Sequence, residues 1–289
     1  MVSITPGAHR AHSAVNTASY SVMPIDDRPT WVSASSVPLG VTRQVPVGPV
    51  ITNAPLSALT TPARYALRVH VVYLFDIDGT LLHAHGSGRN AFDAVFAEQH
   101  GIANASEGIR YGGKTDPQIV NEIYAARLGR AATSDEHAAF IAAYLPRLRS
   151  LLEQHPVEVL GGVLETLAYL RERGEVVLGV ATGNVREGAA AKLAAAKLDS
   201  WFGFGGYGCD SHVRAELVAK AVERARADRE VREVIVVGDT IHDITAARAC
   251  GATVCAVATG SDSAEALAHA DVVFRSMAEL PAWHAARFG

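Results

Sequence analysis

The sequence predicts an α/β fold, in which a parallel sheet carries helices on both faces and a helical segment is inserted near its start. Short β-branched and aromatic runs alternate with stretches of helical period after residue 67, which is typical of such a sheet. Three of these runs end in polar side chains, at Asp76, Thr182 and Asp239. Ligands of open α/β sheets bind beyond the carboxyl ends of the strands, so this edge is the expected site.

The composition is that of a globular protein with no nucleic-acid or membrane partner. The 289 residues include 26 Lys and Arg against 30 Asp and Glu, a formal charge of −4, and 49% are hydrophobic. This mildly acidic balance argues against a nucleic-acid-binding face. No apolar run approaches the roughly 20 residues of a membrane span. Cys209, Cys250 and Cys255 form no CxxC pair, so we expect three buried free thiols in a reducing cytoplasm.

Residues 1–66 differ from the rest of the chain. They hold eight of the 12 prolines, are rich in Ser and Thr, and show no persistent helical or alternating period. Such a segment does not bury enough apolar surface to offset its ordering entropy, which predicts a disordered N-terminal extension. It also lacks the basic start and continuous apolar stretch of a signal peptide, so we expect a cytoplasmic protein.

The regular pattern begins with a strand and continues with helices. Residues 68–75 are β-branched and aromatic and end at Asp76, which predicts a buried strand followed by a Gly-containing turn. Pro146 is expected to kink or end the third of the helices that follow. No strand-like run interrupts residues 87–155. The helices are marked by three sets of apolar positions: Phe92, Val95 and Phe96; Ile119, Val120, Ile123 and Tyr124; Phe140, Ile141, Tyr144, Leu145 and Leu148.

Alternation of helices and strands then resumes and continues almost to the end of the chain. It predicts a core domain made of residues 67–86 and 157–289, with a helical domain, residues 87–156, inserted into it. The expected elements are, in order, helix 161–174, strand 175–182, helix 186–198, a short strand near 202–208, helix 214–226, strand 233–239, helix 242–250, strand 252–258, helix 263–270 and strand 271–274.

The polar strand ends form one candidate site. Asp76 and Asp78 follow the first strand, residues 182–184 (Thr-Gly-Asn) end the second long one, and Asp239 ends a third, with Asp243 four residues on. Clustered carboxylates raise one another's pKa unless a cation neutralises them. An all-oxygen site of this kind suits Mg²⁺, which keeps several waters and binds one or two carboxylates together with a substrate phosphate.

Three ordered motifs carry a family resemblance. FDIDGTL (residues 75–81), ATGN (181–184) and VVGDTIHD (236–243) resemble those of the haloacid-dehalogenase-like hydrolase superfamily, nearest its phosphoglycolate-phosphatase-like members. The resemblance covers about 220 residues and leaves out the N-terminal extension. It implies a Rossmann-like core with a small α-helical cap. It also implies Mg²⁺-dependent hydrolysis of a small phosphorylated metabolite by a monomer or homodimer.

The same resemblance implies roles for single residues. Asp76 would attack phosphorus and form an aspartyl-phosphate, and Asp78 would act as general acid and then as general base. Thr182, with Gly183 and Asn184, would bind the transferring phosphoryl group.

The metal would be held by Asp76, Asp239 and the backbone carbonyl of Asp78, with Asp243 orienting its waters or the nearby basic residue. The family's third motif usually supplies a lysine. Here the residue that opens helix 214–226 is Arg214, which we favour because its planar fork suits phosphate. Lys220, two turns into that helix, is the alternative.

Two glycine patterns compete with this interpretation. Residues 108–115 match the P-loop pattern GxxxxGK[ST], but a P-loop needs an apolar strand just before its first glycine, and the preceding residues are polar. Residues 203–208 match GxGxxG without a helix opening at the last glycine. Gly112, Gly113 and Lys114 instead resemble the cap loop that closes over the substrate. His83 and His85 are expected to lie on a mobile surface flap.

Other functions remain open. A phosphomutase on the same scaffold would return the phosphoryl group to a sugar. A phosphonate hydrolase would need a cap lysine that forms a Schiff base, and Lys114 is the candidate. A dehalogenase is disfavoured because Asp78 is present, and retention of Asp76, Thr182 and Asp239 argues against a non-catalytic binding protein.

Overall fold

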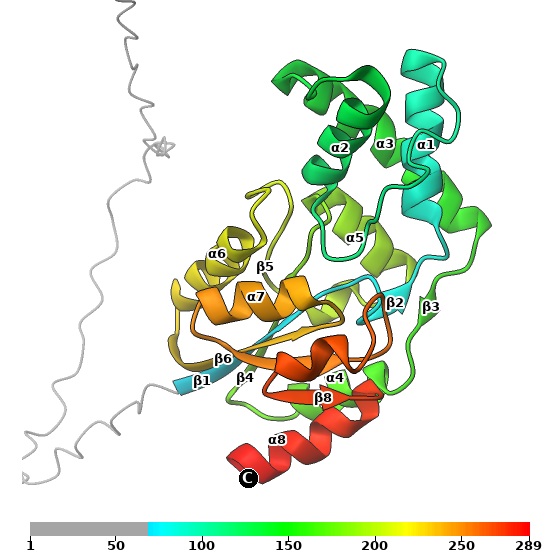
Figure 1. The fold of residues 1–289 in the computed structure, drawn as a ribbon. Coiled ribbons are helices and arrows are strands. Elements are labelled where there is room, and N and C mark those ends of the chain that lie inside the picture. Colours follow the sequence, from blue (N-terminus) through cyan, green and yellow to red (C-terminus); the bar gives the residue numbers. More distant parts are fainter. Residues whose placement is uncertain (1–68) are drawn as a thin grey trace, which may run out of the picture. The chain divides into compact units, whose positions relative to one another are not determined.

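The computed structural model describes residues 69–289; the predicted extension, residues 1–66, lies outside them. Six strands form one sheet in the order β5-β4-β1-β6-β7-β8, and every neighbouring pair is parallel (Figure 1). The predicted α/β class is therefore confirmed. The strands are β1 (Val69–Phe75), β4 (Val176–Ala181), β5 (Gly205–Gly206), β6 (Glu230–Gly238), β7 (Thr253–Val257) and β8 (Val272–Phe274).

Alternate side chains of β1 enter two different cores. Tyr73 and Phe75 pack on one face of the sheet, and Val72 and Leu74 pack on the other. A strand buried on both faces has to be apolar along its whole length, which is why its sequence reads as a continuous run. The first face is covered by α4 (Val163–Arg171), α5 (Arg186–Ala195) and α8 (Leu280–Phe288), and the second by α6 (Arg214–Arg226) and α7 (Ile241–Ala249).

Three helices lie between the two strands of a small antiparallel sheet. These strands, β2 (Leu82–His83) and β3 (Glu158–Val159), pair with each other and were not predicted. Between them run α1 (Ser87–His100), α2 (Asp116–Leu128) and α3 (Ser134–Gln154), which we call the α1–α3 segment (Figure 1). Its centre is aromatic: the ring of Phe92 meets those of Phe140 and Tyr144 at centroid distances of 5.0 and 4.7 Å.

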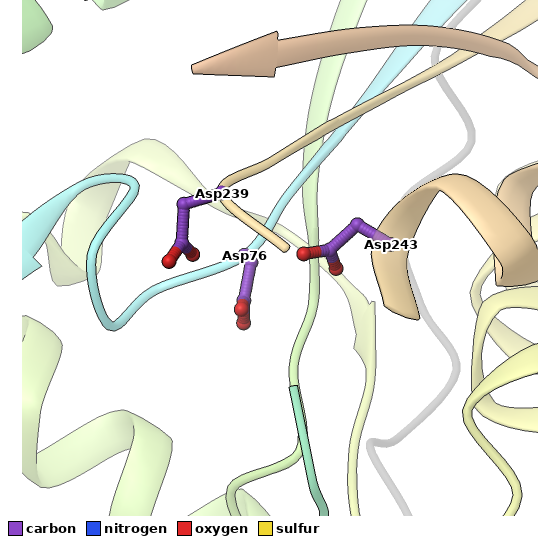
Figure 2. Close-up of side chains that lie close together, drawn as sticks. All are labelled: Asp76, Asp239 and Asp243. Carbon is purple, nitrogen blue, oxygen red and sulfur yellow. The ribbon is translucent and has the colours of Figure 1, made fainter. Parts of the chain in front are cut away.

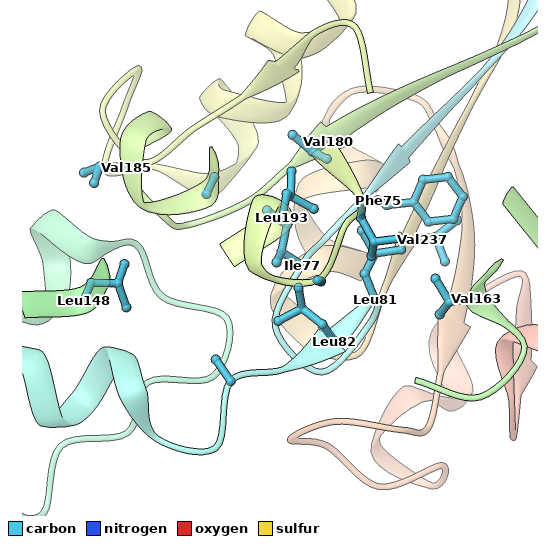
Figure 3. Packing of buried hydrophobic residues seen from close by; sticks show 14 of the residues in the cluster. Phe75, Ile77, Leu81, Leu82, Leu148, Val163, Val180, Val185, Leu193 and Val237 are labelled. Carbon is cyan, nitrogen blue, oxygen red and sulfur yellow. The ribbon is translucent and has the colours of Figure 1, made fainter. Parts of the chain in front are cut away.

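This segment shares a hydrophobic core with the first face of the sheet. Leu148 of α3 belongs to the same buried cluster as Val180 of β4 and Leu193 of α5 (Figure 3). Burial of these side chains stabilises the segment against the sheet, since each fully buried aliphatic side chain contributes about 1.5–3 kcal/mol. The loops that leave the segment are thereby held over one edge of the sheet.

Helix α3 does not end at Pro146, contrary to one of the two outcomes expected from the sequence. It continues to Gln154 with the proline inside it. A proline in a helix costs about 3 kcal/mol, because a backbone hydrogen bond is lost and the ring crowds the preceding turn. Phe140 and Tyr144 before it and Leu148 and Leu152 after it are all buried on the same face. Burial of that face on both sides of Pro146 offsets the cost.

The C-terminal region departs most from the sequence prediction. Predicted helix 263–270 is a single 3₁₀ turn, Ala266–His269, in which only Leu267 is buried. One buried contact does not offset the cost of starting an isolated helix. Helix α8 was not predicted, although a capping box formed by Ser276 and Glu279 precedes it.

Two further observations concern the cysteines and the lengths of the helices. All three cysteines are free, but only Cys255 is buried as expected, whereas Cys209 is exposed and Cys250 lies between. Within residues 69–289, none of the helices combines the length and the apolar character that crossing a membrane requires.

Candidate active site

Three polar side chains meet at the carboxyl edge of the sheet because their strands are neighbours. In the register of the sheet, Phe75 of β1 lies between Val180 of β4 and Val237 of β6. The residues that follow these strands therefore converge. Asp76, Thr182 and Asp239 are 6%, 0% and 1% exposed.

Asp76, Asp239 and Asp243 form a buried carboxylate cluster. Each offers an oxygen, and these oxygens lie within 4.8 Å of one another; Figure 2 shows Asp76 between Asp239 and Asp243. Burial raises the pKa of Asp76 to about 6, aided by Asp243 and opposed by Arg214. Burial, together with Asp76 and Asp243, raises the pKa of Asp239 to about 8. The cluster thus has more negative charge than its surroundings neutralise.

Asp243 is fixed by the start of helix α7. Its Oδ2 accepts hydrogen bonds from the backbone N–H and the hydroxyl of Thr240, at 3.1 and 2.7 Å, in a capping box. Such a box satisfies N–H groups that the first turn of a helix leaves without partners. The other oxygen, Oδ1, is left to face Arg214.

Arg214 is the cation of the cluster. Its Nη2 lies 2.7 Å from both Asp76 and Asp243, and its Nη1 donates to the backbone carbonyl of Gly113 at 3.3 Å. Burial opposes its charge, but the two carboxylates outweigh burial and raise the pKa of Arg214. Lys220, by contrast, pairs with Glu223 on the exposed side of α6, away from the cluster.

The donor set fits Mg²⁺. It consists of carboxylate oxygens without nitrogen or sulfur ligands, and the raised pKa values indicate that a cation is favoured there. The turn after β1 approaches Asp239 closely. Gly79 has φ +82°, and a Cβ at this position would lie 2.6 Å from Oδ2 of Asp239. Only glycine permits that approach.

Asp78 has two partners, of which one was missed by the sequence analysis. Nζ of Lys192 lies 2.8 and 2.6 Å from its two carboxylate oxygens, and the amide of Asn184 donates to it at 2.7 Å. Burial acts to raise the pKa of Asp78, but Lys192 and Asn184 outweigh it and the pKa is lowered. Lys192 lies on the buried face of α5, beside Ala189 and Leu193. The sequence did offer a signal for this partner, because Lys192 occupies an apolar position of an amphipathic helix.

Asn184 and Thr182 form the adjoining part of the site. Nδ2 of Asn184 donates to Oγ1 of Thr182 at 2.8 Å, and its Oδ1 accepts from Lys192 at 2.7 Å. These bonds fix both side chains beside Asp78. Gly183 lies between them, and its carbonyl accepts from the backbone N–H of Asp116 at 2.8 Å.

A cavity of about 430 Å³ lies over these residues. Its walls come from the strand ends and from the loop that leads into α2, residues 111–116. Asp116, which the sequence analysis also missed, is 6% exposed, and its Oδ2 accepts from the backbone N–H of Val185 at 2.8 Å. The α1–α3 segment thus contacts the core directly at the site.

The loop residues Gly113 and Lys114 both line this cavity. Gly113 has φ +73°, and a Cβ there would lie 2.7 Å from Cγ of His242, so only glycine seats the loop against that ring. Nζ of Lys114 lies 2.5 Å from Glu122, an ion pair within the α1–α3 segment.

The histidines and the glycine patterns are also located by the structure. His83 lies in β2 and His85 follows it; both line the cavity, and His85 is 3.3 Å from Glu158. The segment directly before residues 108–115 is helix α1 and a turn, with no strand between β2 and residue 108, and α6 begins only at Arg214, six positions after Gly208. Neither glycine pattern has the context of a nucleotide-binding loop.

Comparisons with known proteins find a matching family model and a similar enzyme. Residues 71–251 match the family model of haloacid dehalogenase-like hydrolases. Over 226 residues the chain is 27% identical to validoxylamine A 7'-phosphate phosphatase of Streptomyces hygroscopicus subsp. limoneus. This alignment covers 73% of this chain and 96% of that protein.

Two solved structures are similar in fold. CbbY from Rhodobacter sphaeroides, in complex with phosphate, has a TM-score of 0.56 at 19% sequence identity. The similar region covers 73% of this chain and 96% of the CbbY chain. A protein from Bacteroides vulgatus, provisionally named a beta-phosphoglucomutase, has a TM-score of 0.57 at 20% sequence identity. The similar region covers 77% of this chain and 91% of that protein.

Proposed function

The chain belongs to the haloacid dehalogenase-like hydrolase family, and on that premise we propose that it hydrolyses phosphate monoesters of small organic molecules, with Asp76 as nucleophile. One observation carries the proposal: Asp76 is buried at the floor of the cavity, 2.7 Å from Arg214, with Asp78 and Thr182 beside it. The similarity to a phosphatase supports it.

In the first step an oxygen of Asp76 attacks phosphorus, the ester P–O bond breaks, and an aspartyl-phosphate forms. Arg214 and the hydroxyl of Thr182, together with nearby backbone N–H groups, stabilise the charge on the phosphoryl oxygens. In the second step water attacks the same phosphorus, the bond to Asp76 breaks, and orthophosphate leaves.

Asp78 moves the protons of both steps. Lys192 and Asn184 keep its carboxylate ionised, so the proton that Asp78 passes to the oxygen of the leaving alcohol is one that it has taken from the bound phosphate monoester; it then takes another from the attacking water. Lys192 and Asn184 hold its carboxylate in one position, which keeps it in reach of both oxygens. Such proton transfer contributes about 10²–10⁴-fold to rate.

Asp76 and Asp239, with the backbone carbonyl of Asp78, are the residues that would hold Mg²⁺. The ion, when bound, neutralises negative charge on the phosphoryl group. Asp243 acts through Arg214, whose guanidinium it orients by two hydrogen bonds at 2.9 and 2.7 Å.

The α1–α3 segment acts as a cap over the site. This cap is an inserted domain of residues 87–156, and the core that carries it consists of residues 67–86 and 157–289. Gly113 and Lys114 belong to the loop that covers the substrate and excludes water. The contact between Asp116 and residues 183–185 joins the cap to the phosphate-binding part of the core.

The test is orthophosphate release from p-nitrophenyl phosphate and a panel of small phosphate esters, with Mg²⁺ and with EDTA. Mg²⁺-dependent release that is lost in the Asp76→Asn variant is expected. The similarity to a protein named as a phosphoglucomutase makes a mutase the second candidate. Conversion of glucose 1-phosphate to glucose 6-phosphate without orthophosphate release would favour that reaction instead.

A further inference from the structure

The cations on the cavity wall already have partners. Among the described residues, each Lys and Arg that lines the cavity is hydrogen-bonded to other protein groups. The pairs are Arg214 with Asp76 and Asp243, Lys192 with Asp78 and Asn184, Lys114 with Glu122, and Arg89 with the backbone carbonyls of Ser106 and Ile109. Apart from the phosphoryl site at Arg214, the wall therefore offers little to a second anionic group.

The remaining basic side chains that line the cavity are those of His83 and His85. His83 is partly exposed, and the side chain of His85 is 53% exposed, 3.3 Å from Glu158. Because solvent screens charges at such positions, these histidines compensate a second anion less than a buried lysine or arginine would.

Asp116 is the opposite case, because it is a buried acid on the wall that no ion pair among the described residues neutralises; Lys192, whose charge acts on it, pairs with Asp78 instead. It is 6% exposed, and no Lys, Arg or His in residues 69–289 forms an ion pair with it. Its Oδ2 accepts from the backbone N–H of Val185, while its other oxygen makes no hydrogen bond to a described residue. This oxygen is not sealed from solvent, so a donor that enters the cavity can reach it.

Asp116 and the proposed acid Asp78 border the same part of the cavity. The two carboxylates accept hydrogen bonds from adjacent residues, Asp78 from the side-chain amide of Asn184 and Asp116 from the backbone N–H of Val185, and both line the cavity. A leaving group held by Asp78 therefore extends toward Asp116. A hydroxyl on that group would supply the missing donor, whereas a carboxylate or second phosphate would meet a like charge.

We infer that Asp116 is a specificity-determining residue, which selects a leaving group bearing neutral hydroxyls and rejects one bearing a carboxylate or a second phosphate. This inference rests on the proposed phosphatase function. The cavity of about 430 Å³ has the size range of small-molecule sites and suits a sugar-sized polyol phosphate.

The experiment compares kcat/KM of the full chain for two matched pairs of esters. The pairs are glycerol 3-phosphate with 3-phosphoglycerate, and glucitol 6-phosphate with 6-phosphogluconate. In each pair the first ester has a hydroxymethyl group where the second has a carboxylate. The hydroxylated member of each pair is expected to be preferred by at least about tenfold, because like charges in a buried site repel strongly.

The Asp116→Asn variant should reduce or reverse that preference. The amide oxygen can still accept from Val185, and the NH₂ group would then present a donor to a carboxylate. Asp93→Asn is the matched control. Asp93 also accepts a backbone N–H, from Ser106 at 2.7 Å, and does not line the cavity, so this equal change of charge should leave the ratio unaltered.

The possible results separate the inference from the function on which it rests. Hydrolysis of p-nitrophenyl phosphate with equal or better use of the carboxylate-bearing esters would overturn the role of Asp116 and leave the phosphatase proposal standing. So would an Asp116→Asn variant whose preference matches that of Asp93→Asn. If no ester were hydrolysed, p-nitrophenyl phosphate included, the proposed function would fail and the inference with it. Should Asp116→Asn not fold, the preference of the unaltered chain still decides.

Discussion

Lys192 holds Asp78 by both carboxylate oxygens, at 2.8 and 2.6 Å, from a side chain that is only 7% exposed. A buried lysine is costly unless an acid pairs with it, so its presence on the inner face of α5 is tied to Asp78. The pair also explains why the pKa of Asp78 is lowered, whereas burial raises that of Asp76 and Asp239 nearby.

Replacing Lys192 with Met should therefore raise the pKa of Asp78. In the proposed mechanism Asp78 has to be ionised to accept a proton, so kcat/KM falls on the acid side, where this group becomes protonated, and that fall should move to higher pH. The pH profile of kcat/KM measures it. Lys197→Met, an exposed position just beyond α5, is the control and should keep the original profile. An unchanged profile in Lys192→Met would contradict the role given to this pair.

The two acids after β1 should respond differently to loss of charge. Asp76→Asn should abolish turnover because the amide does not attack phosphorus. Asp78→Asn should slow it by about 10²–10⁴-fold, the usual contribution of general acid–base catalysis. Single-turnover release of orthophosphate measures both, with circular dichroism to show that each variant folds. Near-normal turnover by Asp76→Asn would rule it out as nucleophile.

Arg214 should matter for stability as well as for activity. It is the cation paired with both Asp76 and Asp243, so Arg214→Ala leaves buried carboxylates uncompensated and should cost about 3–5 kcal/mol of unfolding free energy. Denaturant titration measures this loss. Lys220→Ala on the same helix should change stability by less than about 0.5 kcal/mol, as expected for an exposed residue. Equal losses in the two variants would refute the assignment.

Asp116 should make the protein less stable as pH rises. Burial raises its pKa to about 6 from an ordinary value of 3.8, so the folded chain binds this proton more tightly than the unfolded chain. The resulting stability is present below about pH 4 and lost as pH rises through about 6, amounting to about 3 kcal/mol. Asp116→Asn removes the titration. Its unfolding free energy, relative to the unaltered chain, should increase between pH 4 and pH 7.5; a constant difference would contradict this.

Gly113→Ala should weaken substrate binding by displacing the loop from His242. The new methyl group would contact that ring, so KM should rise while the residues around Asp76 keep their geometry. Gly108→Ala is a close control from the same loop: its φ is +81°, yet nothing lies within 4 Å of its added Cβ. Both changes should cost about 1 kcal/mol of stability for the left-handed backbone. Only Gly113→Ala should raise KM.

The converging strand ends were predictable because the geometry of parallel sheets requires them. Two apolar runs stop at an acid, at Asp76 and at Asp239. In a parallel sheet these two side chains lie at the same edge whatever the order of the strands. The order itself, with β1 between β4 and β6, does not follow from local sequence. It depends on which helix packs on which face.

Lys192 and Asp116 escaped prediction for a related reason. Each reaches the site from a helix through tertiary packing, and neither belongs to a strand-end motif. For Lys192 the available signal is a lysine on an apolar helix face. Asp116 gives no such signal, because an acid in the first turn of a helix is ordinary and its burial follows only from packing. Helix α8 and the 3₁₀ turn at Ala266–His269 likewise depend on contacts that short segments do not encode.

The position of β1 in the middle of the sheet has a consequence during protein synthesis. Asp76 is made early, Thr182 much later and Asp239 later still, yet β4 and β6 must pair with opposite edges of β1 before the three side chains meet. A growing chain on the ribosome, or a fragment cut before β6, carries Asp76 without Asp239 or Asp243. The buried carboxylate cluster therefore forms only after β6 and α7 have been made and β6 has paired with β1.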